Sequence, residues 1–353
     1  MPSRRPKLGC QSGPSTDEHF AFLARFGVRH VCASPVIPDP GRLCPTVEEL
    51  SGLREMVERH GLALEMTDSH LLRSTLIDDE KHPAIMLGSS PERDHDIGAF
   101  QQLLRNCAAV GIGTVKYNMS LLGVVRNREE RGRGGVIYSG WKAGADAQSP
   151  GLTRAGEVDE STYWGRIRYF LERVVPVANE CKVRIACHPQ DPGLPALGYR
   201  GVQCVLGSVA GLDRFLSIAE SPYHGLNFCQ GTVCSQLEHP QEEIFDVIRN
   251  LGARGKIFNV HIRNVRGRRG DFVETFPDDG EIDMVRAVRT YREVGYDGML
   301  MPDHVPLLPF NHPGDPYAYN YGQATSAADG HRESFAFAYG YLRGLLQATE
   351  PAS

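Results

Sequence analysis

The chain has 353 residues, of which 41% are hydrophobic and 23% charged, and its formal net charge is −5. This composition is ordinary for a folded globular protein and argues against a disordered chain. The basic runs are short and no run of about eighteen apolar residues occurs, so neither a nucleic-acid partner nor a membrane span is expected.

The cysteine pattern and the N-terminal segment indicate the cellular compartment in which the protein is expected. Nine cysteines are scattered along the chain without a Cys-x-x-Cys pair, which is typical of a protein from a reducing compartment. The basic segment 1–6 is not followed by an apolar stretch, so an export signal is not expected. We therefore expect a cytoplasmic protein.

A short apolar or β-branched run, followed by a loop and a helix-like segment, recurs along the chain. Most of these runs are continuously apolar, which is typical of parallel strands covered by helices. The predicted strands are 7–10, 28–34, 62–69, 113–119, 183–189, 226–230, 257–264 and 299–304.

Helical spacing is clearest at 162–181, where apolar residues recur every three or four positions. Asp159 or Ser161 is expected to cap this helix, and Pro176 predicts a kink within it. A second clear helix is 282–294, with Gly295 after its end. The remaining predicted helices are 17–26, 46–60, 92–110, 208–220, 240–251 and 326–347.

Eight strand and helix units predict an α/β protein, a closed (β/α)8 TIM barrel forming a single domain over 1–353. An open doubly wound sheet is the alternative, but no glycine-rich fingerprint follows the first strand. The stretches 127–158 and 306–329 fit the repeat poorly. We expect both to be long loops that act as lids or bind substrate.

Four successive predicted strands each end with a side chain that can bind a metal: His188, Cys229, His261 and Asp303. Alone, a buried histidine or cysteine is usually a core residue. In a barrel, however, these strand ends meet at one mouth, where active sites lie. Nitrogen, thiolate and carboxylate donors suit one divalent ion such as Zn²⁺, Co²⁺ or Fe²⁺, so a shared metal site is predicted.

This part of the chain also resembles the D-mannonate dehydratase family. The resemblance rests on His188-Pro189-Gln190-Asp191-Pro192, Asn227-Phe228-Cys229-Gln230-Gly231-Thr232, His261-Ile262-Arg263-Asn264-Val265, Phe272-Val273-Glu274, Gly280-Glu281-Ile282-Asp283-Met284 and Pro302-Asp303-His304, and more weakly on Lys116-Tyr117-Asn118-Met119. It implies that the four donors hold one ion, Mn²⁺ or another divalent metal. It also implies a lyase that dehydrates a six-carbon sugar acid to a 2-keto-3-deoxy acid.

That reaction needs a base to remove the proton beside the carboxylate and an acid to assist the leaving hydroxide. His304 matches the family's catalytic histidine. The family's catalytic tyrosine falls near His331, and Tyr319, with Tyr317 and Tyr321 beside it, is an alternative from the preceding loop. Packing within a lid would explain these tyrosines equally well.

Six residues at strand ends or in the following loops are predicted to bind substrate or support the site: Lys116, Asn118, Arg126, Arg263, Asn264 and Glu274. Asp68 and His70 are weaker candidates. Rim ion pairs would equally explain Lys116 and Arg263, and a loop carboxylate would explain Glu274.

Two residues depart from the family's pattern, because Met301 replaces an arginine and Val305 replaces a glycine. Lys116 is expected to supply the missing positive charge.

We expect a metal-dependent enzyme of carbohydrate metabolism that dehydrates mannonate or a related aldonate. Two alternatives remain: a divalent-metal sugar isomerase or epimerase that forms an enediol, which the lost arginine favours, and a catalytically silent carbohydrate-binding barrel. The expected partners are a sugar acid or sugar and further copies of the chain, since exposed barrel helices often pair.

Overall fold

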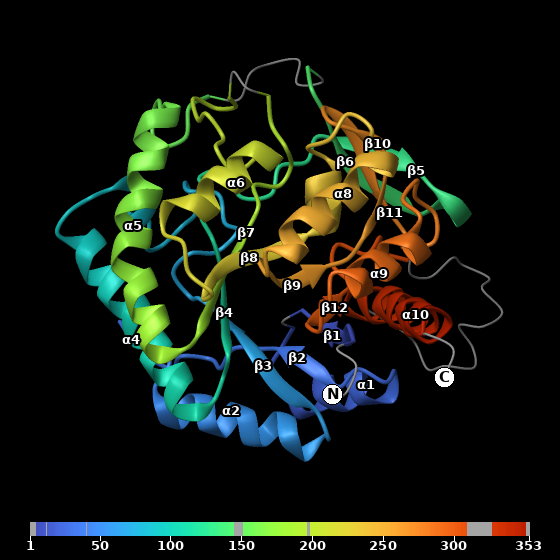
Figure 1. Ribbon diagram of the computed structural model, residues 1–353, viewed down its shortest axis with the longest axis horizontal. Helices are drawn as coiled ribbons and strands as arrows, with labels where there is room; N and C mark the ends of the chain where they lie inside the picture. Colours follow the sequence, from blue (N-terminus) through green and yellow to red (C-terminus); the bar gives the residue numbers. More distant parts are fainter. Residues whose placement is uncertain are drawn as a thin grey trace.

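The computed structural model describes residues 5–11, 13–39, 41–144, 151–195, 198–308 and 327–350, with 327–331 as backbone only. Within these residues, eight parallel strands close into a barrel in the order β1-β12-β9-β8-β7-β4-β3-β2 (Figure 1). The strands are β1 (Lys7–Cys10), β2 (His30–Cys32), β3 (Ala63–Asp68), β4 (Thr114–Asn118), β7 (Arg184–His188), β8 (His224–Cys229), β9 (Ile257–His261) and β12 (Met299–Met301). Each overlaps a predicted strand, so the predicted barrel is confirmed.

Helices surround the barrel, as Figure 1 shows most clearly for α2, α4 and α5. They are α1 (Asp17–Arg25), α2 (Val47–Arg59), α3 (Ala84–Leu87), α4 (Glu92–Val110), α5 (Glu160–Cys181), α6 (Val209–Ile218), α7 (Gln230–Cys234), α8 (Pro240–Ala253), α9 (Met284–Glu293) and α10 (Ala327–Ala348). Asp159 caps α5, because its side chain accepts a hydrogen bond of 2.7 Å from the Thr162 amide. Pro176 lies inside that helix.

Alternating side chains of β7 and of β12 serve two different layers, as the pleat requires. In β7, Ile185 and Cys187 belong to the large core between strands and helices, whereas Ala186 packs inside the barrel. His188 therefore continues the inner face at the end of the strand. The inner apolar layer is small and consists of Cys32, Met66, Ala186, Phe258, Met299 and Met301.

A separate antiparallel sheet lies beside the barrel, at the upper right of Figure 1. Its strands β5 (Arg128–Arg131), β6 (Ile137–Lys142), β10 (Asn264–Arg268) and β11 (Asp271–Thr275) occur in the order β10-β11-β6-β5. The prediction of a loop throughout 127–158 is therefore wrong, because part of it is a hairpin whose β6 pairs with β11. Its action as a lid stays a prediction.

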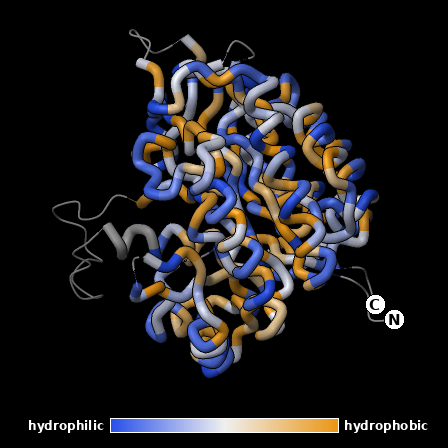
Figure 2. The backbone as a smooth tube through the Cα atoms, turned by 90° about the vertical axis from the view of Figure 1, so that its left-hand side faces the viewer, coloured by the Kyte–Doolittle hydropathy of each residue, from blue (hydrophilic) through white to orange (hydrophobic). Residues whose placement is uncertain are grey.

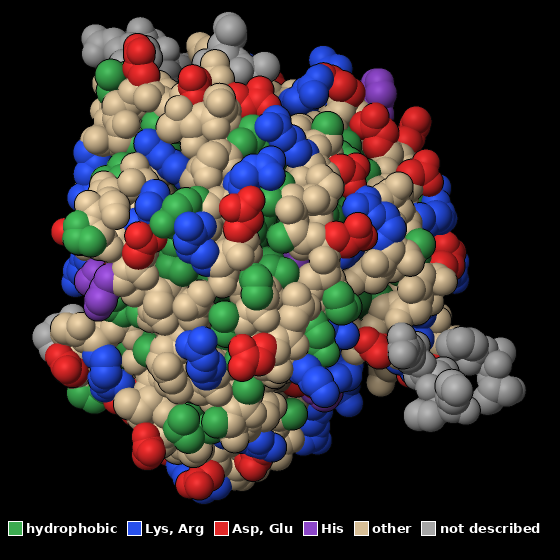
Figure 3. Space-filling model, turned by 60° about the vertical axis from the view of Figure 1, so that its left-hand side comes forward, with side chains coloured by type: hydrophobic (Ala, Val, Ile, Leu, Met, Phe, Trp, Pro, Cys, Tyr) green, Lys and Arg blue, Asp and Glu red, His purple; other side chains and the backbone are tan. Residues whose placement is uncertain are grey.

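Hydrophobic and hydrophilic stretches alternate at short intervals along the chain (Figure 2), as expected for helices with one buried face. Basic and acidic side chains are interspersed over the face shown in Figure 3. No helix in the described part of the chain is long and apolar enough to cross a membrane.

The core between α5 and the barrel gives a prediction about stability. Phe170 is fully buried and contacts the rings of Phe100 and Tyr117, with centroids 5.1 and 5.5 Å away. Phe170→Ala should lower the free energy of unfolding by about 3–5 kcal/mol, because it leaves a cavity. Leu152→Ala is the control, since Leu152 is 57% exposed and should change it by about 0.5 kcal/mol or less. Urea unfolding checks both, and equal losses would contradict this packing.

Candidate metal centre

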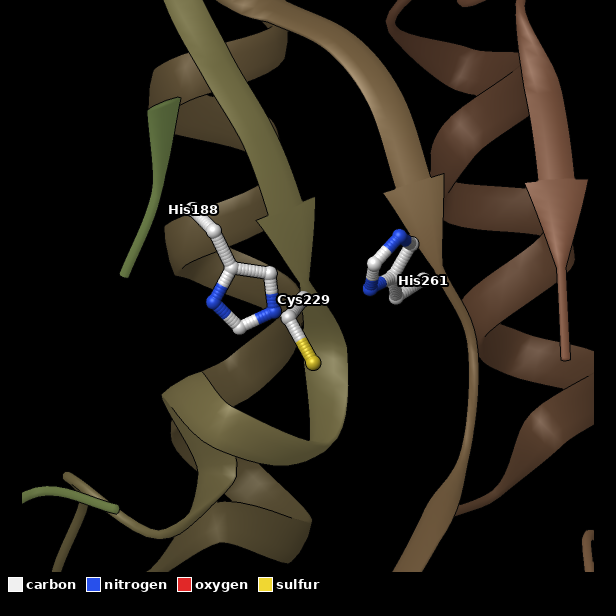
Figure 4. A group of neighbouring side chains, drawn as sticks. All are labelled: His188, Cys229 and His261. Carbon is white, nitrogen blue, oxygen red and sulfur yellow. The ribbon is translucent and has the colours of Figure 1, made fainter. Parts of the chain in front are cut away.

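Three potential metal ligands converge at one end of the barrel. His188, Cys229 and His261 end the neighbouring strands β7, β8 and β9, and their ligand atoms all lie within 4.8 Å of one another. Cys229 and His261 are also paired in register. Figure 4 shows the Cys229 thiol at the end of its strand, between the two imidazole rings.

Asp303 lies next to this group, two residues after the end of β12. Its Oδ2 atom is 3.6 Å from Cys229 Sγ and 3.5 Å from His261 Nδ1. The structure therefore brings the four predicted donors together. Their binding of a metal stays a prediction.

The hydrogen bonds of the donors fit a bound cation. His188 Nδ1 lies 2.7 Å from the Pro189 carbonyl and donates to it, which leaves Nε2 free to coordinate. His261 Nδ1 and Asp303 Oδ1 are buried, and neither has a hydrogen-bond partner among the described residues. Buried polar atoms without partners are costly. A divalent ion would satisfy Asp303 Oδ1, whereas His261 presents its Nε2 atom to the Asn227 amide at 3.1 Å.

Burial sets the protonation of the donors. It lowers the pKa of His188 to about 3, assisted by the neighbouring His261, and also lowers the pKa of His261. Both imidazoles are therefore neutral, the form that binds metals. Burial raises the pKa of Cys229 well above its usual value. Its thiolate needs a nearby cation, and Thr232 Oγ1 at 3.0 Å donates a further hydrogen bond to its sulfur.

Arg263 holds the surrounding carboxylates in place. Its guanidinium contacts Asp303 Oδ2, lies 2.6 Å from Asp191 Oδ2 and 3.1 Å from Glu274 Oε1, and donates to Thr232 Oγ1. The side chain is 2% exposed. Arg263 is therefore a buried residue that orients a predicted metal ligand, which fits the supporting role predicted for it, and its contact with substrate stays a prediction.

Arg126 forms the second cationic part of this network, between Asp191 and Glu274. Its Nη2 atom lies 2.8 Å from Asp191 Oδ1 and contacts Glu274 Oε1. Sequence reasoning did not select Asp191, although it follows ligand His188 in a motif that carried the family resemblance. Its arginine partners are 65 and 72 residues away in the chain, so only the fold identifies its role.

His304 and Glu274 form a pair at the edge of the site. His304 Nδ1 lies 2.9 Å from Glu274 Oε1, and the His304 side chain is 32% exposed. Burial lowers the pKa of His304, but the Glu274 carboxylate more than offsets this and raises it. Glu274 is 5% exposed and binds His304 and two arginines. It therefore supports the site rather than meeting substrate directly.

The backbone at His304 adopts φ = +42°. This is an unfavourable conformation for a residue with a Cβ and is concentrated at functional sites. It turns the side chain toward a cavity of about 670 Å³ that Asp303, His304, Cys10 and Tyr339 help to line. His304 is thus accessible beside the predicted metal ligands.

Asn264 takes a supporting role, one of the two predicted for it, and its contact with substrate stays a prediction. Its Nδ2 donates to the carbonyls of Pro277 and Ile282, and its Oδ1 accepts from the amides of Val265 and Ile282, all at 2.9–3.0 Å. The side chain is therefore fully used in holding the loop between β11 and α9.

Lys116 and Asn118, at the end of β4, remain available to substrate. They line a second cavity of about 630 Å³, together with Asp68 and His70. Lys116 Nζ forms an ion pair of 2.8 Å with Asp68 Oδ1. Asn118 is paired in register with His188, which places this cavity beside the metal donors.

Asp191, Glu274 and His304 form another group whose ligand atoms lie within 4.8 Å of one another. Arg126 and Arg263 pair with both of its carboxylates. These cations already balance the negative charge, so we do not assign a second metal here.

The predicted tyrosine site cannot be placed. Tyr319, Tyr317 and Tyr321 lie outside the described residues, as does the side chain of His331 and most of 306–329. Their catalytic and lid roles stay predictions.

Comparison with known proteins agrees with this geometry. The family model for D-mannonate dehydratase (UxuA) matches residues 139–334, which is more than half of the chain. The chain belongs to the D-mannonate dehydratase family. Mannonate dehydratase 2 of Halalkalibacterium halodurans is 29% identical over 95% of this chain and 97% of its own length. The mannonate dehydratase of Shouchella clausii is 30% identical over 73% of this chain and 76% of its own length.

Solved structures show the same fold. A mannonate dehydratase from Streptococcus suis serotype 2 superposes with a TM-score of 0.77 at 23% identity, covering 98% of this chain and 95% of that one. A D-psicose 3-epimerase from Clostridium cellulolyticum gives a TM-score of 0.59 at 13% identity, covering 96% and 99%. The family's barrel architecture is therefore shared with sugar epimerases.

The donor geometry predicts the metal content of variants. His188→Ala should purify with little or no divalent metal, because it removes one of three converging donors, while its stability changes only modestly. Elemental analysis measures the ion per chain. His239→Ala is the matched control, since His239 is exposed and does not belong to the group of converging donors, and it should keep its metal. Full occupancy in His188→Ala would remove the assignment.

Proposed function

We propose that the chain is a metal-dependent hydro-lyase that converts D-mannonate, or a closely related aldonate, to a 2-keto-3-deoxy acid. One observation carries the proposal: four converging metal donors lie beside an accessible histidine that a buried carboxylate holds in place. The named relatives are mannonate dehydratases, which favours this reaction over the alternatives.

The metal would be held by His188, Cys229, His261 and Asp303. When bound there, a divalent ion would supply Lewis-acid chemistry toward the carboxylate or adjacent hydroxyl of the sugar acid. Family resemblance favours Mn²⁺, whereas a thiolate donor suits Zn²⁺, Co²⁺ or Fe²⁺.

His304 is proposed to carry one of the two proton transfers. Glu274 occupies its Nδ1 atom, so Nε2 is the atom that remains to exchange a proton with substrate in the cavity. Glu274 and Arg263 fix the position of the ring and of Asp303, which keeps the proton-transfer group next to the bound acid. The second transfer is assigned to Tyr319 or His331.

The lost arginine before Pro302 does not leave an empty position at the mouth. Met301 is fully buried inside the barrel, and its sulfur lies 3.2 Å from Asn259 Nδ2. Lys116, from β4, is a cation beside the mouth, but Asp68 pairs with its ammonium at 2.8 Å. Its replacement of the arginine's charge therefore stays a prediction.

The reaction itself is testable directly. The metal-loaded protein should form a 2-keto-3-deoxy acid from D-mannonate, measured by a colour assay for the product, and should leave neutral ketoses unchanged. Interconversion of ketoses without dehydration would favour the isomerase or epimerase alternative. No turnover of any aldonate or ketose would favour the silent carbohydrate-binding alternative.

His304→Asn should reduce turnover about 100-fold or more while the protein keeps its metal, because the variant loses a proton-transfer group and no donor. Product formation and metal content are measured on the same preparation. A rate close to that of the unaltered protein would place the role on another residue.

Glu274→Gln should reduce turnover by about tenfold, because the amide holds the His304 ring less firmly than a carboxylate does. The double variant Glu274→Gln, His304→Asn should be no slower than His304→Asn alone. Further loss in the double variant would show that Glu274 acts independently of His304.

A further inference from the structure

The mouth of the barrel has two chemically different halves. The metal donors come from β7, β8, β9 and β12, which are consecutive in the barrel order. The other four strands are β4, β3, β2 and β1. Lys116 and Asp68, on β4 and β3, give this second half its charged pair.

Removing the Lys116 and Asp68 charges from water costs free energy of folding, and the packing of the barrel does not require this ion pair. The Lys116 side chain is 9% exposed, and its Nζ atom is 2.8 Å from Asp68 Oδ1, whose side chain is 25% exposed. Buried ion pairs rarely improve stability over apolar residues of similar size. The two residues are paired in register on neighbouring strands, so their side chains meet on the inner face and open into the cavity of about 630 Å³.

This cavity adjoins the metal centre. Asn118, which lines it, is in register with His188, and Gln11 lines both it and the cavity that contains Asp303 and His304. Lys116 is also close enough for its charge to contribute to lowering the pKa of His261. An open-chain molecule anchored at the metal donors can therefore extend toward Lys116 and Asp68.

The chemistry of the pair suits hydroxyl groups. Lys116 offers ammonium donors, Asp68 offers carboxylate acceptors, and Asn118 offers both. Because the two charges balance, the pair has no net charge with which to select a carboxylate. A row of alcohols, each both donor and acceptor, matches it instead.

We propose that Lys116, Asp68 and Asn118 bind the hydroxyls beyond C3 of the sugar acid, and so select substrates by chain length. This inference rests on the proposed function, because it places the carboxyl end of the acid at the metal donors. The part of the sugar acid away from its carboxylate would therefore lie at the ends of β3 and β4.

Binding calorimetry on the metal-loaded protein tests the proposal with D-mannonate and L-glycerate, which has the same carboxylate and C2 configuration but ends at C3. Lys116→Met should weaken D-mannonate binding about tenfold or more, the scale of a lost charged hydrogen bond. It should change L-glycerate binding by less than about twofold. Lys81→Met is the matched control, since Lys81 is an exposed lysine on the wall of the same cavity, and it should alter neither affinity.

Loss of the Lys116 charge leaves the half-buried Asp68 without this partner, so a second variant controls for misfolding. Lys116→Met combined with Asp68→Asn removes both charges and should show the same dependence on chain length. Equal weakening of both acids, or no weakening of either, would overturn the proposal.

The two proposals fail in distinguishable ways. If the unaltered protein binds D-mannonate without dehydrating it, the proposed function fails while the chain-length comparison still decides the present inference. If the unaltered protein binds neither acid at millimolar concentration, both are overturned.

Discussion

The site depends on the buried contact between Arg263 and three carboxylates. Asp303, Asp191 and Glu274 come from different parts of the chain, and each alone would be costly to bury as an anion. Arg263 contacts all three, and Arg126 contacts two of them. The planar guanidinium can hold several oxygens at once, which an ammonium group cannot do as precisely. It thereby fixes a predicted metal ligand and, through Glu274, the histidine beside it.

The barrel could be predicted because each of its strands and helices leaves a local pattern in the sequence. The alternation of apolar runs and helical stripes identified all eight barrel strands, and the polar residue ending each of four strands identified the donors. The antiparallel sheet was not predictable in this way. Its β5 consists of Arg and Glu alone, which is unusual for a strand, and its β6 pairs with β11, about 130 residues further along. For the same reason the role of Asp191 depends on partners 65 and 72 residues away, Arg126 and Arg263, that no local pattern reveals.

The inner face of the barrel changes character along its length. Below the mouth it is filled by methionine, phenylalanine, cysteine and alanine, while the strand ends carry histidine, lysine, asparagine and carboxylates. Inward-facing side chains at alternate strand positions thus form an apolar interior below a polar mouth. Met301 belongs to the interior and Asp303 to the mouth, although they are only two positions apart in the sequence. This is why a change before Pro302 alters packing inside the barrel and leaves the donors in place.

Glu274 stands on β11, outside the barrel proper, and β11 is held on one side by β6 from the 128–142 hairpin. The barrel thus contributes the donors and His304, while an appended module contributes the carboxylate that positions the histidine. The position of the histidine therefore depends on a sheet that the eight-stranded scaffold does not itself contain.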